Sequence, residues 1–505
     1  MKYVEIMDTT LRDGEQTEGV SFTGTEKLII AEYLLKKAKV DAVEVTSARM
    51  SEGEFETLAK INKWAKNNKY LEKIEVLGFV DGTKSAQWIY DSGGRVINIL
   101  SKGSLRHLEG QLKKTPEKHA EDISRIFDFA GEKRMAVNAY LEDWSNGMID
   151  SKEYVLFLID KLQSFGVNRV MLADTLGILD YEKTYDFVHE MVKKYPAVTF
   201  DFHGHNDYDL ATANSIAAAK AGAARLHVTV NGLGERAGNA KLASLAAALN
   251  DLSDYKIKVN EQELNGLSNL VERISGIRTA SNTPIIGENV FTQNCGVHAD
   301  GDKKAELYQS RLSPERFGRE RRYGLGKTAG IASLDQNIEQ LQLEINLDEE
   351  QKIKVLQRLK ELAHKKEIIT REDLPYIIED VIGTPVLDKV EMVDYEFLMK
   401  QNSPPKARVK LKINGTEQEK TSQGDGQYDA FMNAVKGIYV AHEKQFPELV
   451  DYSSRIPPGG QTSALVETTI TWKKNGNIFK TRGVDSDQLL SAMEATMKMM
   501  NIKYN

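Results

Sequence analysis

The chain has 505 residues, which is too many for one ordinary domain and, at roughly 150 residues per domain, predicts about three units. Its 74 acidic and 67 basic residues give a net charge of −7, so the overall charge attracts neither nucleic acid nor anionic lipid. No apolar run approaches the roughly 20 residues that span a bilayer, and residues 1–8 look like a strand rather than a signal peptide, so we expect a cytoplasmic protein without nucleic-acid or membrane partners.

Short β-type runs alternate with longer helical patterns through the first 250 residues. Amphipathic helices are expected at 26–37, 54–66, 152–165, 181–194 and 211–221. The eight expected strands are 4–8, 42–46, 74–80, 96–100, 135–140, 170–174, 199–203 and 226–229. Eight βα units predict a closed (β/α)₈ TIM barrel, with the active site at the C-terminal ends of the strands. No G-x-G-x-x-G motif follows the first strand, which argues against a doubly wound nucleotide-binding sheet.

The alternation stops after the barrel, which we expect to occupy residues 1–265. Residues 266–390 are mostly helical with charged surfaces, for example 348–366, and predict a helical linker. Residues 391–505 predict a small α+β domain, with strands at 407–413 and 464–472 and helices at 424–435 and 485–500.

The segment 8–16 at the end of the first expected strand contains an arginine beside a carboxylate, Arg12 and Asp13. A guanidinium can polarise a carbonyl or hold a carboxylate, and an aspartate can bind a hard cation. From this segment alone, a functional pair and an ordinary surface Arg–Asp ion pair are about equally good interpretations.

Two histidines lie at the end of the seventh expected strand, and alternation along an extended segment places His203 and His205 on one face. With an oxygen ligand such as Asp13, two imidazoles can hold a divalent ion. The single cysteine, Cys295, excludes an intrachain disulfide and a cysteine-cluster metal site, so any ligands must be histidine and oxygen groups. After the eighth strand, the glycine-rich segment 231–239 permits tight turns, and its Asn239 offers a further carbonyl oxygen.

Candidate acid–base groups occur at two places. Glu142 ends the fifth expected strand, where it could orient or deprotonate a substrate, although a helix-capping acidic cluster is the alternative. Thr175, with its hydroxyl, ends the sixth strand at the same opening. His298 lies outside the barrel and could reach over its mouth as a general base, whereas the neighbouring Cys295 is expected to serve packing.

Together these segments resemble the acyl-CoA-dependent Claisen-condensing enzymes, which comprise isopropylmalate, citramalate and homocitrate synthases. The matching motifs are D-x-T-L-R-D-G-E-Q at 8–16, H-G-H-N-D at 203–207, G-L-G-E-R-A-G-N at 232–239 and G-V-H-A-D-G at 296–301. The G-D-G at 424–426 and the P-P-G-G at 457–460 resemble the family's regulatory domain, which binds the end-product amino acid.

The resemblance implies a divalent metal, usually zinc and sometimes manganese or magnesium, and acetyl-CoA as co-substrate of a 2-oxo acid. It implies that Arg12 polarises the keto oxygen, that Thr175 holds the carboxylate, and that Glu142 and His298 serve the acid–base steps. It also implies small-molecule substrates and a homodimer. The implied metal ligands are Asp13, His203, His205 and Asn239.

Substrate choice within the family depends on Leu77, Leu100 and Tyr140, which look like the pyruvate pocket of citramalate synthases. Residues 140–146 also depart from the F-x-x-E-D pattern of isopropylmalate synthases. The resemblance therefore favours (R)-citramalate synthase, with isopropylmalate synthase as the alternative. A 3-hydroxy-3-methylglutaryl-CoA lyase would lack the C-terminal extension, and a non-catalytic amino-acid sensor would not need a complete site.

In the C-terminal domain, one group of residues matches positions that bind isoleucine in citramalate synthases, which implies feedback inhibition. The alternative interpretation is an ordinary dimerisation core. The residues are Tyr428, Asp429, Tyr452, Ile456, Thr462 and Val466.

Overall fold

The computed structural model describes two compact units, Met1–Phe291 with Ser310–Glu320, and Thr292–Gln309 with Arg321–Asn505. Within them the described residues are 2–294, 301, 307, 310–341, 343, 345–364, 369–383, 390–413, 415–440, 446–456, 465–474 and 477–501. Among these residues, no helix combines the length and apolar character that crossing a membrane requires.

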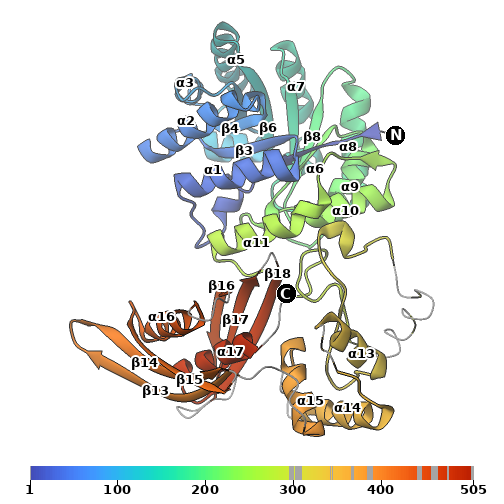
Figure 1. Ribbon diagram of the computed structural model, residues 1–505. Coiled ribbons are helices and arrows are strands. Elements are labelled where there is room, and N and C mark those ends of the chain that lie inside the picture. Colours follow the sequence, from blue (N-terminus) through green and yellow to red (C-terminus); the bar gives the residue numbers. More distant parts are fainter. Residues whose placement is uncertain are drawn as a thin grey trace. The chain divides into compact units, whose positions relative to one another are not determined.

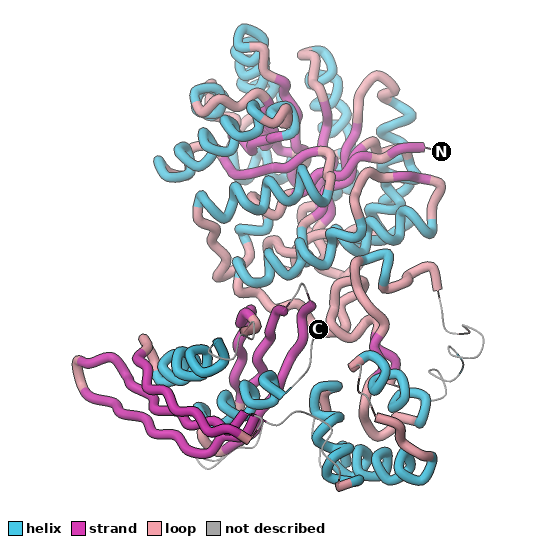
Figure 2. The backbone as a smooth tube through the Cα atoms, in the orientation of Figure 1, coloured by secondary structure: helices cyan, strands magenta, loops and turns pink. Residues whose placement is uncertain are grey.

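The first unit confirms the predicted TIM barrel: eight parallel strands close on themselves, and helices surround them (Figures 1 and 2). Closure comes from the pairing of the first barrel strand with the last, where Glu5 to Asp8 lie beside Arg225 to Val228. In order around the barrel the strands are β2 (Glu5–Asp8), β3 (Ala42–Ser47), β4 (Ile74–Phe79), β5 (Val96–Lys102), β6 (Ala136–Glu142), β7 (Arg169–Asp174), β8 (Phe200–Gly204) and β9 (Arg225–Val228).

The outer helices begin where the sequence carries capping residues. Thr23 and Glu26 form a capping box at the start of α1, and Ser51, Thr115 and Asp180 accept backbone hydrogen bonds at the starts of α2, α5 and α8. The helices that follow the barrel strands are α1 (Gly24–Glu32, continued by a π-helical segment Tyr33–Ala38), α2 (Glu52–Asn67), α3 (Lys84–Asp91), α5 (Pro116–Lys133), α7 (Lys152–Ser164), α8 (Tyr181–Lys194), α9 (Ala211–Ala221) and α10 (Leu242–Leu252). Short helices α4 (Leu105–His107) and α6 (Trp144–Asp150) precede α5 and α7, and α11 (Leu264–Ser275) adds Leu267 and Val271 to the barrel core.

The inside of the barrel is layered, because neighbouring strands are in register and alternate residues point inward. Between β5 and β6, Asn98 lies beside Asn138, Leu100 beside Tyr140, and Lys102 beside Glu142. The asparagine layer is polar: Asn138 donates to Asn98 Oδ1 at 2.8 Å, and Asn98 donates to Glu44 Oε1 at 2.7 Å. Toward the C-terminal mouth, the next layer contains Leu100 and Tyr140, and the layer after that contains the charged residues Lys102 and Glu142.

The second unit contains a helical part and a strand-rich part. Helices α13 (Ile331–Gln340), α14 (Glu349–His364) and α15 (Leu374–Ile382) share an apolar core that includes Leu334, Leu359 and Ile378. Helix α14 occupies most of the charged helical segment expected at 348–366.

The strand-rich part is α+β, as predicted, and consists of two three-stranded antiparallel sheets with helices packed on them. The sheets are β13 (Val390–Lys400), β14 (Ser403–Ile413) and β15 (Thr416–Gln423), then β16 (Glu448–Arg455), β17 (Val466–Lys474) and β18 (Asn477–Asp485); the helices are α16 (Gln427–Val440) and α17 (Gln488–Asn501). The central strands β14 and β17 were predicted, whereas the edge strands were not. Edge strand β15 shows why: it is largely exposed and has no apolar alternation to signal a strand.

Candidate metal centre at the barrel mouth

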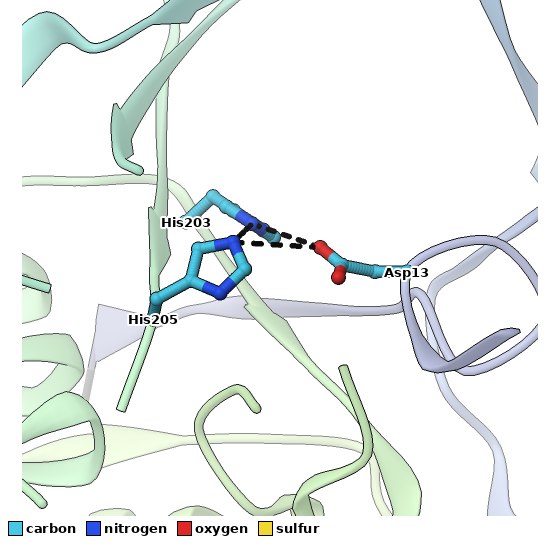
Figure 3. Close-up of side chains that lie close together, drawn as sticks. All are labelled: Asp13, His203 and His205. Carbon is cyan, nitrogen blue, oxygen red and sulfur yellow. Dashed lines mark hydrogen bonds and ion pairs between the residues drawn. The ribbon is translucent and has the colours of Figure 1, made fainter. Parts of the chain in front are cut away.

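Three predicted metal ligands come together at the C-terminal mouth of the barrel. After β2, Thr9 accepts the backbone N–H groups of Arg12 and Asp13, which folds the motif into a tight turn. Strand β8 carries His203, and His205 follows it. Figure 3 shows both imidazoles directed at the Asp13 carboxylate: Asp13 Oδ2 lies 3.2 Å from His203 Nε2 and 3.8 Å from His205 Nε2, and the two Nε2 atoms are 3.4 Å apart.

The electrostatics of this cluster suit a divalent cation. Burial raises the pKa of Asp13, but Arg12 and the two histidines outweigh it and bring the pKa well below its usual range. Burial lowers the pKa of His205 to about 4, so near neutral pH its ring offers a lone pair. Buried lone pairs that converge on one point are costly without a cation between them. Asp13, His203 and His205 can therefore hold a metal ion.

Asn239, the fourth predicted ligand, lies beside this cluster. Its backbone forms an antiparallel bridge with that of His205, and its Nδ2 donates to Leu233 O at 3.2 Å. Its Oδ1 is buried and has no hydrogen-bond partner among the described residues, and the same is true of Asp13 Oδ1. A methyl group at Gly234, where φ is +151°, would lie 2.1 Å from Asn239 Nδ2 and 3.2 Å from Asp13 Oδ1. Glycine at this position therefore lets the loop approach the candidate ligands. The two histidine nitrogens and the two oxygens, from Asp13 and Asn239, are a donor set that fits a zinc or manganese ion.

Arg12 is held in place by residues of strands β3 and β6 and by the neighbouring Asp13. Its Nε donates to Glu44 Oε2 at 2.6 Å, Nη1 to Asp13 Oδ2 at 3.2 Å, and Nη2 to the Tyr140 hydroxyl at 3.3 Å. Burial by itself lowers the pKa of Arg12, but Glu44 and Asp13 raise it above its ordinary value. The guanidinium is thus a permanent, oriented positive charge next to the candidate metal ligands.

The three residues of the predicted substrate pocket also lie together. Leu77 and Tyr140 are buried, and Leu100 packs against the same cluster inside the barrel. The Tyr140 ring meets His203 edge-on at 5.8 Å, and Arg12 lies over it at 5.5 Å from the ring centre. This small apolar cluster, which also contains Met7 and Met171, therefore adjoins the metal centre and the guanidinium.

The other predicted catalytic residues have different surroundings. Glu142 forms an ion pair with Lys102. Thr175 accepts the backbone N–H of Asp143 at 2.8 Å through its hydroxyl, and its carbonyl accepts from Arg236 at 2.6 Å. His298 lies outside the described residues.

The predicted regulatory residues are partly assembled in the second unit. The rings of Tyr428 and Tyr452 are 5.4 Å apart, and the Tyr428 hydroxyl lies 2.7 Å from Thr496 Oγ1. Asp429 accepts the backbone N–H of Asp425 at 3.0 Å at the start of α16. Ile456 is 63% exposed just after β16, Val466 begins β17, and Thr462 lies outside the described residues.

Sequence reasoning missed three side chains of the mouth: Glu44, Lys102 and His227. Glu44 accepts from Arg12, and His227 Nδ1 lies 3.2 Å from the Tyr140 hydroxyl. Each lies on a barrel strand, where a charged or polar residue at an inward position is the available signal. Their partners are distant in the sequence, on other strands or, for Glu44, in the loop after β2, so this signal could not predict which residues they contact.

Three family models together match nearly the whole chain. A model described as HMGL-like matches residues 3–271, one described as homocitrate synthase post-HMGL domain-like matches residues 285–367, and one described as LeuA allosteric (dimerisation) domain matches residues 368–504.

Individual relatives show the same full-length similarity. An (R)-citramalate synthase from Methanocaldococcus jannaschii is 33% identical over 99% of this chain and 100% of its own. A 2-isopropylmalate synthase from the same organism is 32% identical over 99% of this chain and 94% of its own. The solved structure of hydroxymethylglutaryl-CoA lyase from Pseudomonas aeruginosa shares the barrel fold, with a TM-score of 0.50, 19% identity, and coverage of 57% of this chain and 98% of that one. The chain therefore belongs to the family of citramalate and 2-isopropylmalate synthases, which are acyl-CoA-condensing transferases.

Proposed function

We propose that the protein condenses acetyl-CoA with pyruvate to give (R)-citramalate and CoA. The observation that carries this proposal is the small apolar cluster of Leu77, Leu100 and Tyr140 beside Arg12 and the metal centre. Full-length sequence identity does not discriminate between the two substrates, because the citramalate and isopropylmalate synthases from one organism are 33% and 32% identical to this chain.

Tyr140 is the residue that limits the size of the substrate. Its hydroxyl lies 3.2 Å from both Glu44 Oε2 and His227 Nδ1 and accepts from Arg12, so the ring cannot turn aside without breaking buried hydrogen bonds. Forcing extra methyl groups against such a ring typically costs about 1 to 3 kcal/mol. That cost corresponds to a preference for pyruvate over 2-oxoisovalerate of roughly 5- to 150-fold.

The reaction needs a proton removed from the acetyl methyl group, a carbon–carbon bond to the keto carbon, and hydrolysis of the thioester. A bound divalent ion would supply Lewis-acid polarisation of the 2-oxo acid, held by Asp13, His203, His205 and Asn239. Arg12 would stabilise the negative charge that develops on the keto oxygen when the new bond forms. Glu142 and His298 would move protons, Thr175 would hold the substrate carboxylate, and water would release CoA from the thioester.

Two other enzyme activities and one non-enzymatic function are weaker alternatives. A 2-isopropylmalate synthase would need space for an isopropyl group at Tyr140. A 3-hydroxy-3-methylglutaryl-CoA lyase is disfavoured by the matched models that continue to residue 504. A non-catalytic sensor would have no reason to keep the buried, converging side chains of the barrel mouth.

The proposal predicts a substrate preference that a thiol assay can measure. CoA release from acetyl-CoA should show a kcat/KM for pyruvate roughly 5- to 150-fold higher than for 2-oxoisovalerate. Leu100→Ala should narrow the ratio by making room in the pocket, whereas Leu252→Ala, a 72% exposed position on α10, should leave it unchanged. A higher kcat/KM for 2-oxoisovalerate in the unmodified protein would contradict the substrate assignment.

We further propose that residues 391–505 bind isoleucine and inhibit the barrel at 1–265 through the linker at 266–390. The contact of Tyr428 with Tyr452 supplies one aromatic wall, and the Tyr428 hydroxyl beside Thr496 adds a polar group. A C-terminal model whose description includes the words allosteric and dimerisation supports both this role and the expected homodimer.

Isoleucine should therefore inhibit the full chain, and Tyr428→Ala should raise the concentration for half-inhibition at least about tenfold, because a partly buried aromatic wall is lost. Tyr428→Phe keeps the ring contacts and loses one hydrogen bond, worth about 1 kcal/mol, so a shift of about fivefold is expected. Dose–response curves of CoA release measure both shifts. Inhibition by leucine instead of isoleucine would contradict the assignment of the effector.

A further inference from the structure

The mouth of the barrel contains a buried cation that neither the motifs nor the proposed reaction uses. Lys102, the last residue of β5, is 5% exposed, and its Nζ forms an ion pair with Glu142 Oε2 on the neighbouring strand β6. Among the residues that the structure describes, Glu142 is the one carboxylate within ion-pair distance of Lys102 Nζ. A lysine is rarely buried this deeply without a specific partner, because removing an ammonium group from water is costly.

The backbone around the pair is tightly fixed. Gly103 donates its N–H to Glu142 O at 2.6 Å, and the Tyr154 hydroxyl donates to Lys102 O at 2.7 Å. The backbone N–H of Lys102 also donates to His119 Nε2 at 3.3 Å. A methyl group at Gly147 would lie 2.1 Å from Gly103 O, so the helix after β6 presses directly on the end of β5. Neither strand end can move away from the other without breaking these contacts.

The position of the pair relates it to the substrate pocket. Leu100 and Lys102 lie two residues apart on β5, as Tyr140 and Glu142 do on β6, and each pair of neighbours is in register. Alternation along the strands therefore places Lys102 and Glu142 one layer above Leu100 and Tyr140 on the inward face. The Lys102 side chain is 6% exposed and that of Glu142 is 23% exposed, so the carboxylate, and not the ammonium, meets the opening.

We propose that Lys102 is a positioning residue that orients the ionised carboxylate of Glu142 as the base of the condensation; this inference rests on the proposed function. In that step Glu142 takes a proton from the acetyl methyl group, and the electron pair of the broken C–H bond forms the new bond to the keto carbon. Lys102 transfers no proton and touches no substrate. A carboxylate held by an ion pair stays in the geometry needed for proton transfer from the methyl group, whereas a mobile carboxylate adopts that geometry only part of the time.

A double-mutant cycle of Lys102→Met and Glu142→Gln, measured as CoA release from acetyl-CoA and pyruvate, tests this role. Lys102→Met should lower kcat about 10- to 100-fold and change both KM values by less than about threefold, while Glu142→Gln lowers kcat by about 10²- to 10⁴-fold. The double variant should match Glu142→Gln within about threefold, because Lys102 acts only through Glu142. Lys102→Arg should recover at least about a third of the wild-type kcat, since it restores the charge.

The matched control is Lys152→Met, which removes a lysine from the exposed pair of Lys152 and Glu190 and should leave kcat unchanged. Far-ultraviolet circular dichroism and melting curves check folding, and Lys102→Gln replaces Lys102→Met in the cycle if the latter does not fold. Three results would each overturn the role of Lys102. They are a kcat of Lys102→Met within threefold of wild type, a double variant whose loss of kcat is the product of the two single losses, and no recovery of kcat with Lys102→Arg. Absence of CoA release from the unmodified protein would instead overturn the proposed function.

Discussion

Replacing His203 with alanine should remove the bound divalent ion and lower kcat by at least about 10³-fold, because a metal ion supplies several kcal/mol of charge stabilisation. His203 Nε2 lies 3.2 Å from Asp13 Oδ2 and 3.4 Å from His205 Nε2, so its loss removes one of the converging donors. Elemental analysis of the purified protein after dialysis gives metal per chain, and CoA release gives kcat.

The control for this prediction is His189→Ala on α8, where an exposed imidazole stacks on Tyr185 and should be dispensable for metal. His203 also packs edge-on against His227 and Tyr140, so a melting curve must show that the variant remains folded. Unchanged metal content in folded His203→Ala would remove this residue from the ligand set.

Replacing Arg12 with lysine should lower kcat about 10²- to 10³-fold while metal content stays at the wild-type level. Losing one preorganised donor to a developing oxyanion typically has an effect of this size. Lysine keeps the positive charge between Asp13 and Glu44, but an ammonium group cannot reproduce the three directed donors to Asp13, Glu44 and the Tyr140 hydroxyl. Steady-state CoA release and elemental analysis on the same preparation distinguish a loss of kcat from a loss of bound metal.

Lysine is preferred to methionine here because an uncharged side chain would leave the buried Glu44 carboxylate unpaired, which typically destabilises a protein by about 3 to 5 kcal/mol. Arg49→Lys, at an exposed pair with Asp81, is the matched control and should retain full activity. An Arg12→Lys variant with wild-type kcat would show that the guanidinium does not stabilise the reacting oxygen.

The barrel was predictable because its signals are local. The sequence of strand β8 alternates apolar and polar residues up to His203, with His205 just after the strand, and helix α8 begins after a capping aspartate and matches its predicted bounds. The polar ends of the strands pointed to the mouth, since parallel strands of a barrel all end there. Edge strand β15 of the C-terminal domain carried no such signal, because an exposed strand needs no apolar alternation.

The amino-acid sequence by itself determined the barrel, the types of candidate metal ligand and the family motifs, since periodicity, residue chemistry and spacing are all properties of the chain. Only the tertiary structure decided which partner each charged group faces. Glu44 lies 32 residues from Arg12, Glu142 lies 40 residues from Lys102, and Tyr140 lies 128 residues from Arg12. Such contacts follow from barrel closure and strand register, and a shift of register would give each of these side chains a different neighbour.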